Sequence, residues 1–447
     1  MLVVLVAVLL GAALVGGYAA TDAIRANNGQ FRKPPAPTTP AAYRAAGAAP
    51  TSTPPPAAAP QPAPAAVRAT LAGPVAAPGL GPRLRAEVLD ASAGTVLYDR
   101  GGTAPAPPAS TAKLLTAAAL LAVHRPSDRI TTRVVGGSGG KIVLVGGGDP
   151  TLTGAVKGKP GAYPQAARLS DLAAQLKGRN PSEIVVDDAL FSGPAISPAW
   201  APEDVPSDYG AAITAIMTDG GRATPGASIR SAAPDLAAGH ELAALLGRPS
   251  IPVVRGSAPA GAATLASVES APYSVLIEQM LEESDNVIAE CLARQVALAE
   301  HRPASFTGSA AAIRAVLAGL GVDPGAGMVD GSGLAARDRL SVVALAGVLR
   351  LVVHAPRLHA LLAGLPVAAW SGTLDTRYVG GAARAGAGVV RAKTGTLTGV
   401  SSLAGLVHDR SGRLLIFALI ADRAPSTPAA DAALDLIAAR LAGCGCT

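Results

Sequence analysis

Strand-like patterns stand at both ends of the foldable part of this 447-residue chain. Near its start, residues 84–89 and 95–99 flank an Ala-Ser-Ala-Gly turn, a pattern typical of a β-hairpin. Three further strands are predicted near its end, over residues 389–397, 400–408 and 413–421. Helical patterns lie between the two groups, so we expect an α+β domain whose sheet joins the ends of the folded region.

Four segments have the composition or periodicity of helices, namely residues 110–124, 274–283, 286–299 and 428–441. Between the first two, the sequence changes to short strand patterns separated by glycine and proline, with one helix near residues 170–176. We predict that residues 133–267 form a smaller, β-rich inserted domain. The main domain then consists of residues 77–132 and 268–447.

Residues 1–76 show no pattern that builds a core. Residues 1–20 carry no charge and are long enough to cross a bilayer, so they are either a signal peptide or a membrane anchor. Residues 21–76 are rich in proline and alanine, which predicts a disordered, extended linker. At the other end, Cys444 and Cys446 are predicted to lie in a frayed tail, and Cys291 in the core of a helix.

Charge and cysteine usage exclude several classes of protein. The 37 Lys and Arg residues exceed the 31 Asp and Glu residues by six, without a block of basic residues, so we expect no nucleic-acid partner. Three cysteines cannot build a disulfide scaffold, and the six histidines stand apart from any metal-binding motif. We therefore predict no metal site and no organic cofactor.

The first candidate for catalysis is a Ser-x-x-Lys sequence at the start of a predicted helix, formed by Ser110 and Lys113. At this spacing both side chains lie on one helix face, where a lysine of lowered pKa can take the serine proton and make the hydroxyl a nucleophile. An ordinary helix start with a solvated lysine is the alternative. Ser138 and Lys141 have the same spacing, but they lie in a glycine turn where no helix holds them together.

Two further motifs follow in the chain. Ser284, Asp285 and Asn286 lie at the break between two predicted helices, where a helix cap is the alternative explanation. Residues 393–396, Lys-Thr-Gly-Thr, lie in a predicted strand. Glycine is unfavourable there unless another group approaches the backbone closely or the strand bulges. A chance occurrence of all three motifs in this order, each on a suitable helix or strand, is far less probable than a chance occurrence of any one of them.

Together the three motifs resemble those of the penicillin-recognising serine enzymes. The chain is similar to the D-alanyl-D-alanine carboxypeptidase/endopeptidase family of the DacB type, the class C low-molecular-mass penicillin-binding proteins. Secondary motifs of that family are present at residues 147–152, 330–334 and 371–374. The glutamates between Asn286 and Lys393 are Glu290 and Glu300, and neither has the Glu-x-x-Leu-Asn context of a class A β-lactamase.

This resemblance implies a penicillin-binding-protein/β-lactamase-like transpeptidase domain, in which helices cover both faces of an antiparallel sheet. It implies that Ser110 is the nucleophile, that Lys113 takes its proton and that Ser284 passes a proton to the leaving D-alanine. Substrate binding is assigned by the same resemblance to Asn286, Lys393, Thr394, Gly395 and Thr396. The backbone N–H groups of Ser110 and Thr396 are expected to form the oxyanion hole.

Residues 200–209 resemble the family's pocket for a side chain of the stem peptide. Asp204 is expected to face the cleft as an unpaired carboxylate and to bind the amine of the peptide's third residue, with Tyr209 lining the same pocket. The alternative is a surface loop whose acidic side chains are solvated.

The predicted function is a serine-type D-Ala-D-Ala carboxypeptidase that acts on peptidoglycan stem peptides through an acyl-enzyme, with endopeptidase activity left open. β-Lactam antibiotics are expected as covalent inhibitors. A β-lactamase or esterase on the same scaffold and a non-catalytic wall-binding or sensor protein are the alternatives. Such a substrate predicts a protein outside the cytoplasm, either secreted or held at the membrane by residues 1–20.

Overall fold

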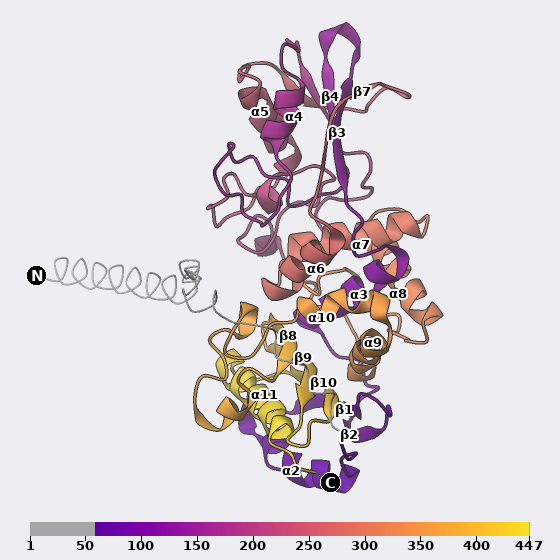
Figure 1. Ribbon diagram of the computed structural model, residues 1–447, viewed down its shortest axis with the longest axis vertical. Coiled ribbons are helices and arrows are strands. Elements are labelled where there is room, and N and C mark those ends of the chain that lie inside the picture. The colour runs from indigo at the N-terminus through magenta and orange to yellow at the C-terminus, as the bar shows by residue number, and fades with distance from the viewer. Residues whose placement is uncertain (1–58, 447) are drawn as a thin grey trace, which may run out of the picture. The chain divides into compact units, whose positions relative to one another are not determined.

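The computed structural model describes residues 59–446. The predicted signal peptide or anchor over residues 1–20, and the linker from residue 21 to residue 58, lie outside the described residues. In the described part no single helix is both long and apolar enough to cross a membrane, and one bent pair, Val342–His354 with Pro356–Ala363, meets that test when its members are counted together. Two five-stranded sheets organise this part of the chain (Figure 1).

The first sheet is antiparallel throughout, with the strand order β2-β1-β10-β9-β8. Its strands are β1 (Arg83–Asp90), β2 (Val96–Arg100), β8 (Arg391–Leu397), β9 (Val400–His408) and β10 (Leu414–Asp422). β1 pairs with β10 over its whole length, from Arg83 opposite Asp422 to Asp90 opposite Leu415. The predicted joining of the first and last strands is therefore confirmed.

Both faces of this sheet are buried. Along β10, Ile416, Ala418 and Ile420 belong to one hydrophobic cluster, whereas Phe417 and Leu419 belong to another. Successive side chains of a strand point to opposite faces, so the division shows that each face has its own cover. The predicted antiparallel sheet with helices on both faces is confirmed.

Six helices contribute to the cluster on one face: α3 (Lys113–Val123), α6 (Tyr273–Glu282), α7 (Asn286–Ala299), α8 (Phe306–Gly319), α9 (Val342–His354) and α10 (Ala360–Ala363). On the other face lie α2 (Pro64–Leu71) and α11 (Thr427–Ala442), which contact each other (Figure 1). The four helices predicted in the main domain are all present: α7 has the predicted ends, and the ends of the other three differ by one to three residues.

The second sheet lies in the segment predicted as an insertion and has the order β6-β5-β4-β3-β7. Its strands are β3 (Thr131–Gly136), β4 (Ile142–Val145), β5 (Ile184–Asp187), β6 (Val253–Arg255) and β7 (Thr264–Glu269). β3 and β7 lead into and out of the segment and pair antiparallel, whereas β5 is parallel to both of its neighbours. The sheet has a separate hydrophobic cluster that includes Leu144, Ile184 and Val186. The limits of the insertion at residues 133 and 267 stay a prediction.

The inserted segment contains more helix than its sequence suggests. α4 (Leu169–Gln175) confirms the predicted helix and α5 (Pro234–Leu245) is an addition, whereas the five strands of the second sheet agree with the predicted β-rich character. Parallel neighbours need a crossover, and α4 and α5 supply it between the parallel strands. Gly239 interrupts the helical pattern of α5, yet a Cβ there would lie 2.5 Å from Val253 and 2.8 Å from Val186. The glycine therefore lets this helix pack directly on the sheet.

Residues 64–76 are folded, so the prediction of a disordered linker over residues 21–76 is wrong for this part of the chain. Val67 and Leu71 of α2 are completely buried. Two short 3₁₀ turns follow, η2 (Pro74–Ala76) and η3 (Pro78–Leu80). All three elements begin with a proline, at a position where the missing N–H costs no helical hydrogen bond. The prolines that suggest an extended linker begin helical turns here.

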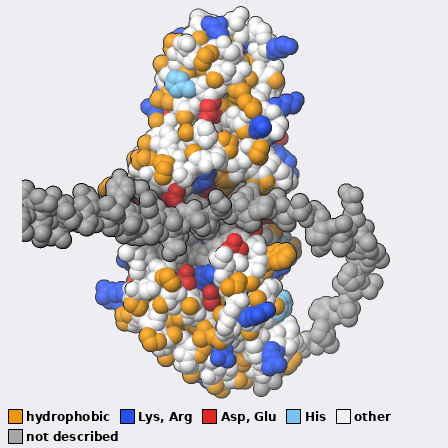
Figure 2. Space-filling model, turned by 90° about the vertical axis from the view of Figure 1, so that its left-hand side faces the viewer, with side chains coloured by type: hydrophobic (Ala, Val, Ile, Leu, Met, Phe, Trp, Pro, Cys, Tyr) orange, Lys and Arg blue, Asp and Glu red, His pale blue; other side chains and the backbone are white. Residues whose placement is uncertain are grey.

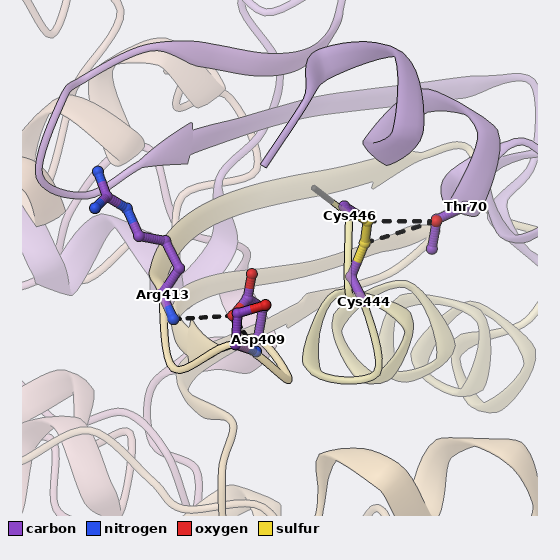
Figure 3. Close-up of a disulfide and its surroundings, with 6 residues drawn as sticks. Thr70, Asp409, Arg413, Cys444 and Cys446 are labelled. Carbon is purple, nitrogen blue, oxygen red and sulfur yellow. Dashed lines mark hydrogen bonds between the residues drawn. A yellow bond between two sulfur atoms is a disulfide. The ribbon is translucent and has the colours of Figure 1, made fainter. Parts of the chain in front are cut away.

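The C-terminal cysteines pack against α2, so the predicted frayed tail is also wrong (Figure 3). Cys444 and Cys446 are 3% and 5% exposed and form a disulfide. The hydroxyl of Thr70 lies 3.6 Å from Sγ of Cys444 and 3.5 Å from Sγ of Cys446. The N–H of Ala63 donates to the carbonyl of Cys446 at 2.6 Å, which fastens the two ends of the described chain to each other. Cys291 is buried in α7, as predicted.

Leu71→Ala tests whether α2 belongs to the fold. The leucine is completely buried, so its truncation is expected to lower the free energy of unfolding by about 2–5 kcal/mol. Arg68→Ala, on the exposed side of the same helix, is the control and is expected to change it by less than about 0.5 kcal/mol. Chemical denaturation followed by circular dichroism makes the measurement, and equal stability of both variants would restore the linker interpretation.

Candidate active site

Ser110 and Lys113 meet where the chain enters the buried helix α3. Ser110 belongs to a 3₁₀ turn, η4 (Ala109–Ala112), and Lys113 is the first residue of α3, so the α-helix begins three residues later than predicted. Ala109 has a left-handed backbone with φ of 48°, which is uncommon for a residue other than glycine. Nζ of Lys113 donates to Oγ of Ser110 at 2.9 Å. The two side chains of the predicted pair are therefore in contact.

The ammonium group of Lys113 is completely buried and has three acceptors. Besides Ser110, Nζ donates to Oδ1 of Asn286 at 2.6 Å and to the carbonyl oxygen of Ser332 at 2.8 Å. Burial lowers the pKa of Lys113 to about 8, although nearby carboxylates, Asp330 foremost, oppose the shift. This lysine releases its proton far more readily than a lysine on the surface.

A second buried lysine holds Ser284. Nζ of Lys393 donates to Oγ of Ser284 and to the carbonyl oxygen of Thr394, at 2.9 Å in both cases. Burial, with the charge of Lys113, lowers the pKa of Lys393 well below its usual range. Ser284 has a left-handed backbone with φ of 57°, between the end of α6 and the start of α7. Two serine hydroxyls are thus each held by a buried lysine.

Gly395 allows β8 to lie against the turn that carries Ser110. A Cβ at this position would lie 2.8 Å from the backbone nitrogen of Ser110 and 2.9 Å from the carbonyl oxygen of Pro108. The register of β8 with β9 is continuous from residue 391 to residue 397, so the strand does not bulge. Of the two explanations for glycine in this strand, the close approach of another backbone is the one observed.

β8 is an outer strand, and one of its edges faces away from β9. The N–H of Ala392 points to this edge, because it donates to the carbonyl of Pro366 at 3.0 Å. The backbone groups of Thr394 and Thr396 face the same edge, because direction alternates along a strand. The Thr394 hydroxyl donates to that of Thr373 at 2.8 Å, whereas Thr396 is exposed. Sequence reasoning assigned no role to Thr373, although the motif at residues 371–374 marked it.

Asp204 and Tyr209 lie together beside Asn286. Nδ2 of Asn286 donates to the carbonyl oxygen of Tyr209 at 3.2 Å. Asp204 is 9% exposed, and its carboxylate accepts from the hydroxyl of Tyr209 at 3.1 Å and from the N–H of Ala201 at 2.7 Å. Asp204 is therefore neither the solvated acid of a surface loop nor the unpaired carboxylate that was expected. Its part in substrate binding stays a prediction, as does that of Tyr209.

Asp285 anchors the inserted segment to the start of α7. It caps that helix by accepting from two backbone N–H groups, which confirms the cap. Its carboxylate also pairs with Arg230 at 2.7 Å and accepts from the hydroxyl of Tyr163 at 2.8 Å. Burial alone raises the pKa of Asp285, but the charge of Arg230 outweighs it and holds this pKa well below its usual range. Sequence reasoning missed Arg230 and Tyr163, because no motif marks them.

Glu290 supports the carbonyl group to which Lys113 donates. It lies one turn after Asn286 in α7 and accepts from the N–H groups of Gly331 and Ser332 at 2.9 and 2.8 Å. Burial raises the pKa of Glu290 to about 7. Sequence reasoning used this residue only to exclude a class A β-lactamase. Its spacing of four residues from Asn286 was the signal that placed it on the same helix face.

Other candidate groups lie outside this site. Ser138 is exposed in the turn η5 (Ser138–Gly140), and Nζ of Lys141 pairs with Glu183 at 2.8 Å instead of contacting the serine. Within residues 59–446, no three His, Cys, Asp or Glu side chains are grouped so that they could hold a metal ion.

Comparisons with known proteins point to one family. The chain matches the family model described as D-Ala-D-Ala carboxypeptidase 3 (S13) over residues 67–228 and 222–441. It is 44% identical over 397 residues to carboxypeptidase Rv3627c of Mycobacterium tuberculosis, with 86% of each chain covered. It is 43% identical over 399 residues to carboxypeptidase DacB of Mycolicibacterium smegmatis, with 87% of this chain and 86% of the relative covered.

Among solved structures, penicillin binding protein 4 (dacB) from Haemophilus influenzae has a similar fold. The TM-score is 0.68 over 83% of this chain and 97% of that chain, at 21% identity. The same protein complexed with a β-lactam gives a TM-score of 0.60 over 79% of this chain and 94% of that chain. The predicted penicillin-binding-protein fold class is confirmed.

Proposed function

This chain belongs to the D-Ala-D-Ala carboxypeptidase 3 (S13) family, and on that premise we propose that it is a serine-type D-Ala-D-Ala carboxypeptidase acting on peptidoglycan stem peptides. The proposed reaction proceeds through an acyl-enzyme, and β-lactams inhibit it by acylating the same serine. One observation carries the proposal. A completely buried lysine, Lys113, lies 2.9 Å from the hydroxyl of Ser110, the arrangement that activates a serine nucleophile.

In the first proposed step, Oγ of Ser110 forms a bond to the carbonyl carbon between the two terminal D-alanines, and neutral Lys113 takes the serine proton. A pKa of about 8 supports this role, because a useful fraction of Lys113 is then neutral near pH 7. Asn286 and Ser332 hold the lysine nitrogen in place. Asn286 has a second proposed role, which is to hold the substrate amide through its side chain.

The oxyanion that forms in this step is proposed to accept from the N–H groups of Ser110 and Thr396. The close approach of β8 to Ser110 at Gly395 supports the pairing. The edge of β8 to which the Thr396 N–H points supports it as well, because that edge faces away from β9.

Departure of D-alanine needs a proton on the leaving nitrogen, and we propose that Ser284 supplies it. The bond between carbonyl carbon and nitrogen breaks, the amine leaves, and the acyl group stays on Ser110. Water then gives a proton to Ser284 as its oxygen bonds to the acyl carbon. The ester bond to Oγ breaks, and Ser110 takes back the proton that Lys113 holds. The hydrogen bond from Lys393 to Oγ of Ser284 supports this role, since it leaves the serine's own proton free to move to the amine.

The terminal carboxylate of the substrate is proposed to lie against Thr394 and Thr396, within the positive field of Lys393. The Thr394 hydroxyl donates to Thr373, so the Thr373 hydroxyl retains its own proton for a further hydrogen bond. We therefore add Thr373 to the proposed carboxylate site.

The pair of Asp204 and Tyr209 is proposed to bind the amine of the stem peptide's third residue. Support comes from the hydrogen bond between Asn286 and the Tyr209 carbonyl, which holds this pair beside the proposed amide site. An ionised carboxylate that already has two donors has remaining lone pairs for an ammonium group.

The proposed substrate places the reaction outside the cytoplasm. Residues 1–20 keep their predicted role as signal peptide or membrane anchor. A mature N-terminus near residues 18–21 would establish release of the protein.

One experiment distinguishes the proposed function from its alternatives. The purified protein is incubated with labelled penicillin and with a pentapeptide that ends in D-Ala-D-Ala. A long-lived adduct together with D-alanine release supports the proposal. Rapid turnover of penicillin would indicate a β-lactamase, and the absence of both reactions would indicate a non-catalytic binding protein.

Ser110→Ala is expected to abolish both penicillin labelling and D-alanine release. Its free energy of unfolding is expected to change by less than about 1 kcal/mol, because Asn286 and Ser332 still accept from Lys113 when the serine hydroxyl is removed. Ser138→Ala is the matched control and is expected to keep both activities. Labelling that persists in Ser110→Ala, or is lost in Ser138→Ala, would place the nucleophile elsewhere.

The rate of penicillin acylation is expected to rise by about tenfold per pH unit below pH 8 and to level off above it, because only neutral Lys113 accepts the serine proton. The rise goes with increasing pH, since a lysine loses its charge as pH passes its pKa. Lys113→Arg is expected to be inactive at every pH, because arginine keeps its proton. A flat profile between pH 6 and 8, or activity in the arginine variant, would remove Lys113 as the base.

Asp204→Asn is expected to slow the reaction on stem peptides with an amine-bearing third residue, by raising the activation free energy about 1–3 kcal/mol. The rate of penicillin acylation is expected to stay almost unchanged. Glu203→Gln, at the exposed neighbouring position, is the control. Equal losses on peptide and penicillin would indicate a folding defect. No loss on either would remove Asp204 from the site.

A further inference from the structure

Trp370 is the most exposed large apolar residue of the described chain, with 81% of its surface accessible. The only other tryptophan of the sequence, Trp200, is 8% exposed, and its Nε1 donates to Asp330 at 2.8 Å. An indole has a large apolar surface and is usually covered in most part. Exposure of most of this side chain to water is therefore unfavourable unless a ligand covers it.

The backbone around Trp370 is held by hydrogen bonds. The N–H of Trp370 donates to the carbonyl of Val367 at 3.0 Å, and the N–H of Ala369 donates to the carbonyl of Leu374 at 2.9 Å. Ala369 has a left-handed backbone with φ of 57°. Such strained residues persist where the surrounding structure fixes them, and they cluster at binding sites. The indole is thus carried by a fixed turn.

Trp370 lines a hollow of about 620 Å³. This volume lies within the range of small-molecule binding sites, about 300–1,000 Å³. Most of the lining is small and apolar, and the polar side chains are those of Glu282, Ser371 and Arg391. The hollow therefore combines one aromatic face with an acid, a hydroxyl and a guanidinium group.

The hollow adjoins the proposed carboxylate site. Glu282 is the last residue of α6, two residues before Ser284. Ser371 is two residues before Thr373, whose hydroxyl accepts from Thr394. Gly372, between Ser371 and Thr373, lies against Glu282, since a Cβ there would be 2.6 Å from the Glu282 carbonyl oxygen. A ligand in the hollow thus lies next to the part of the active site where the C-terminal end of a stem peptide is proposed to bind.

We propose that this hollow binds an N-acetylated amino sugar of a peptidoglycan glycan strand, with the sugar ring on the indole of Trp370. The inference rests on the proposed function, because glycan strands carry the stem peptides. The negative face of an aromatic ring attracts the weakly positive C–H groups of a sugar ring. Glu282 accepts from hydroxyl or acetamido N–H groups, and Arg391 donates to hydroxyl or acetamido oxygens.

The position of the hollow also indicates which glycan strand supplies the sugar. It adjoins the threonines that are proposed to hold the terminal carboxylate, whereas the sugar that carries the bound peptide is attached at the peptide's other end. The sugar in the hollow therefore belongs to a neighbouring strand. Such a site favours polymeric peptidoglycan over free peptide.

Tryptophan fluorescence tests the sugar site directly, because the chain has two tryptophans and one of them is buried. The probe is a tetramer of β-1,4-linked N-acetylglucosamine, which contains no peptide. The native protein is expected to show a saturable change in emission, and Trp370→Ala is expected to show none. A native protein without a change, or an alanine variant that responds like the native protein, would overturn the proposal.

Two further variants separate binding from folding. Val379→Ala, at a position that is 64% exposed and not part of the hollow, is the matched control and is expected to respond like the native protein. Glu282→Gln keeps Trp370 as the reporter and is expected to bind the tetramer at least fivefold more weakly. Unchanged binding by Glu282→Gln would remove the polar half of the proposed site and overturn it.

Penicillin labelling and D-alanine release from a free pentapeptide involve no sugar, so they report on the proposed function alone. Trp370→Ala is expected to keep both and to act about tenfold more slowly on polymeric peptidoglycan. If the native protein shows neither reaction, the proposed function is wrong. The fluorescence titration then still tests whether the hollow binds the sugar. If both reactions occur and the titration is flat, only the sugar site is overturned. A response to the pentapeptide but not to the tetramer would overturn it in favour of a peptide site.

Discussion

The buried ammonium group of Lys113 is the interaction on which the rest of this structure depends. Burying an ammonium group away from water is unfavourable unless hydrogen-bond acceptors replace the water. Lys113 donates to three such acceptors, on Ser110, Asn286 and Ser332. Ser110 is 3 residues from Lys113 in the sequence, whereas Asn286 and Ser332 are 173 and 219 residues away. Satisfying one side chain therefore fixes α3, the start of α7 and the loop at residue 332 relative to one another.

The start of α7 shows how three successive residues serve three different parts of the chain. Ser284 accepts from Lys393 of β8, Asp285 pairs with Arg230 of the inserted segment, and Asn286 accepts from Lys113 of α3. The left-handed backbone of Ser284, followed by a helix start, lets neighbouring side chains point in separate directions. The inserted segment is thereby attached at the residue between two groups of the proposed catalytic site.

The contacts of the site between residues close together in the sequence could be predicted, because they depend only on the spacing of those residues along the chain. Ser110 and Lys113 are one helical turn apart, and glycine at position 395 is explained by a close approach, which is observed at the backbone of Ser110. Arg230 could not be assigned in this way, and neither could the partners of Glu290 at residues 331 and 332, because they depend on how distant segments pack. The proline-rich residues 64–76 were wrongly predicted as a linker for a related reason. Proline is as suitable for the first turn of a helix as for a linker, and the burial of Leu71 decides between the two.

The outer edge of β8 explains why these motifs converge at one place. An edge strand presents backbone groups that need partners, and proteins normally cover or shorten such edges. Here the segment at Pro366 covers the edge at Ala392, and the chain then turns through Trp370 to Thr373, which contacts Thr394. The covered part of the edge ends where the proposed substrate site begins. Beyond Ala392 the same edge presents the backbone groups of Thr394 and Thr396, and Gly395 between them lies against the turn that carries Ser110. The proposed carboxylate site and the proposed nucleophile are therefore held next to each other by one strand.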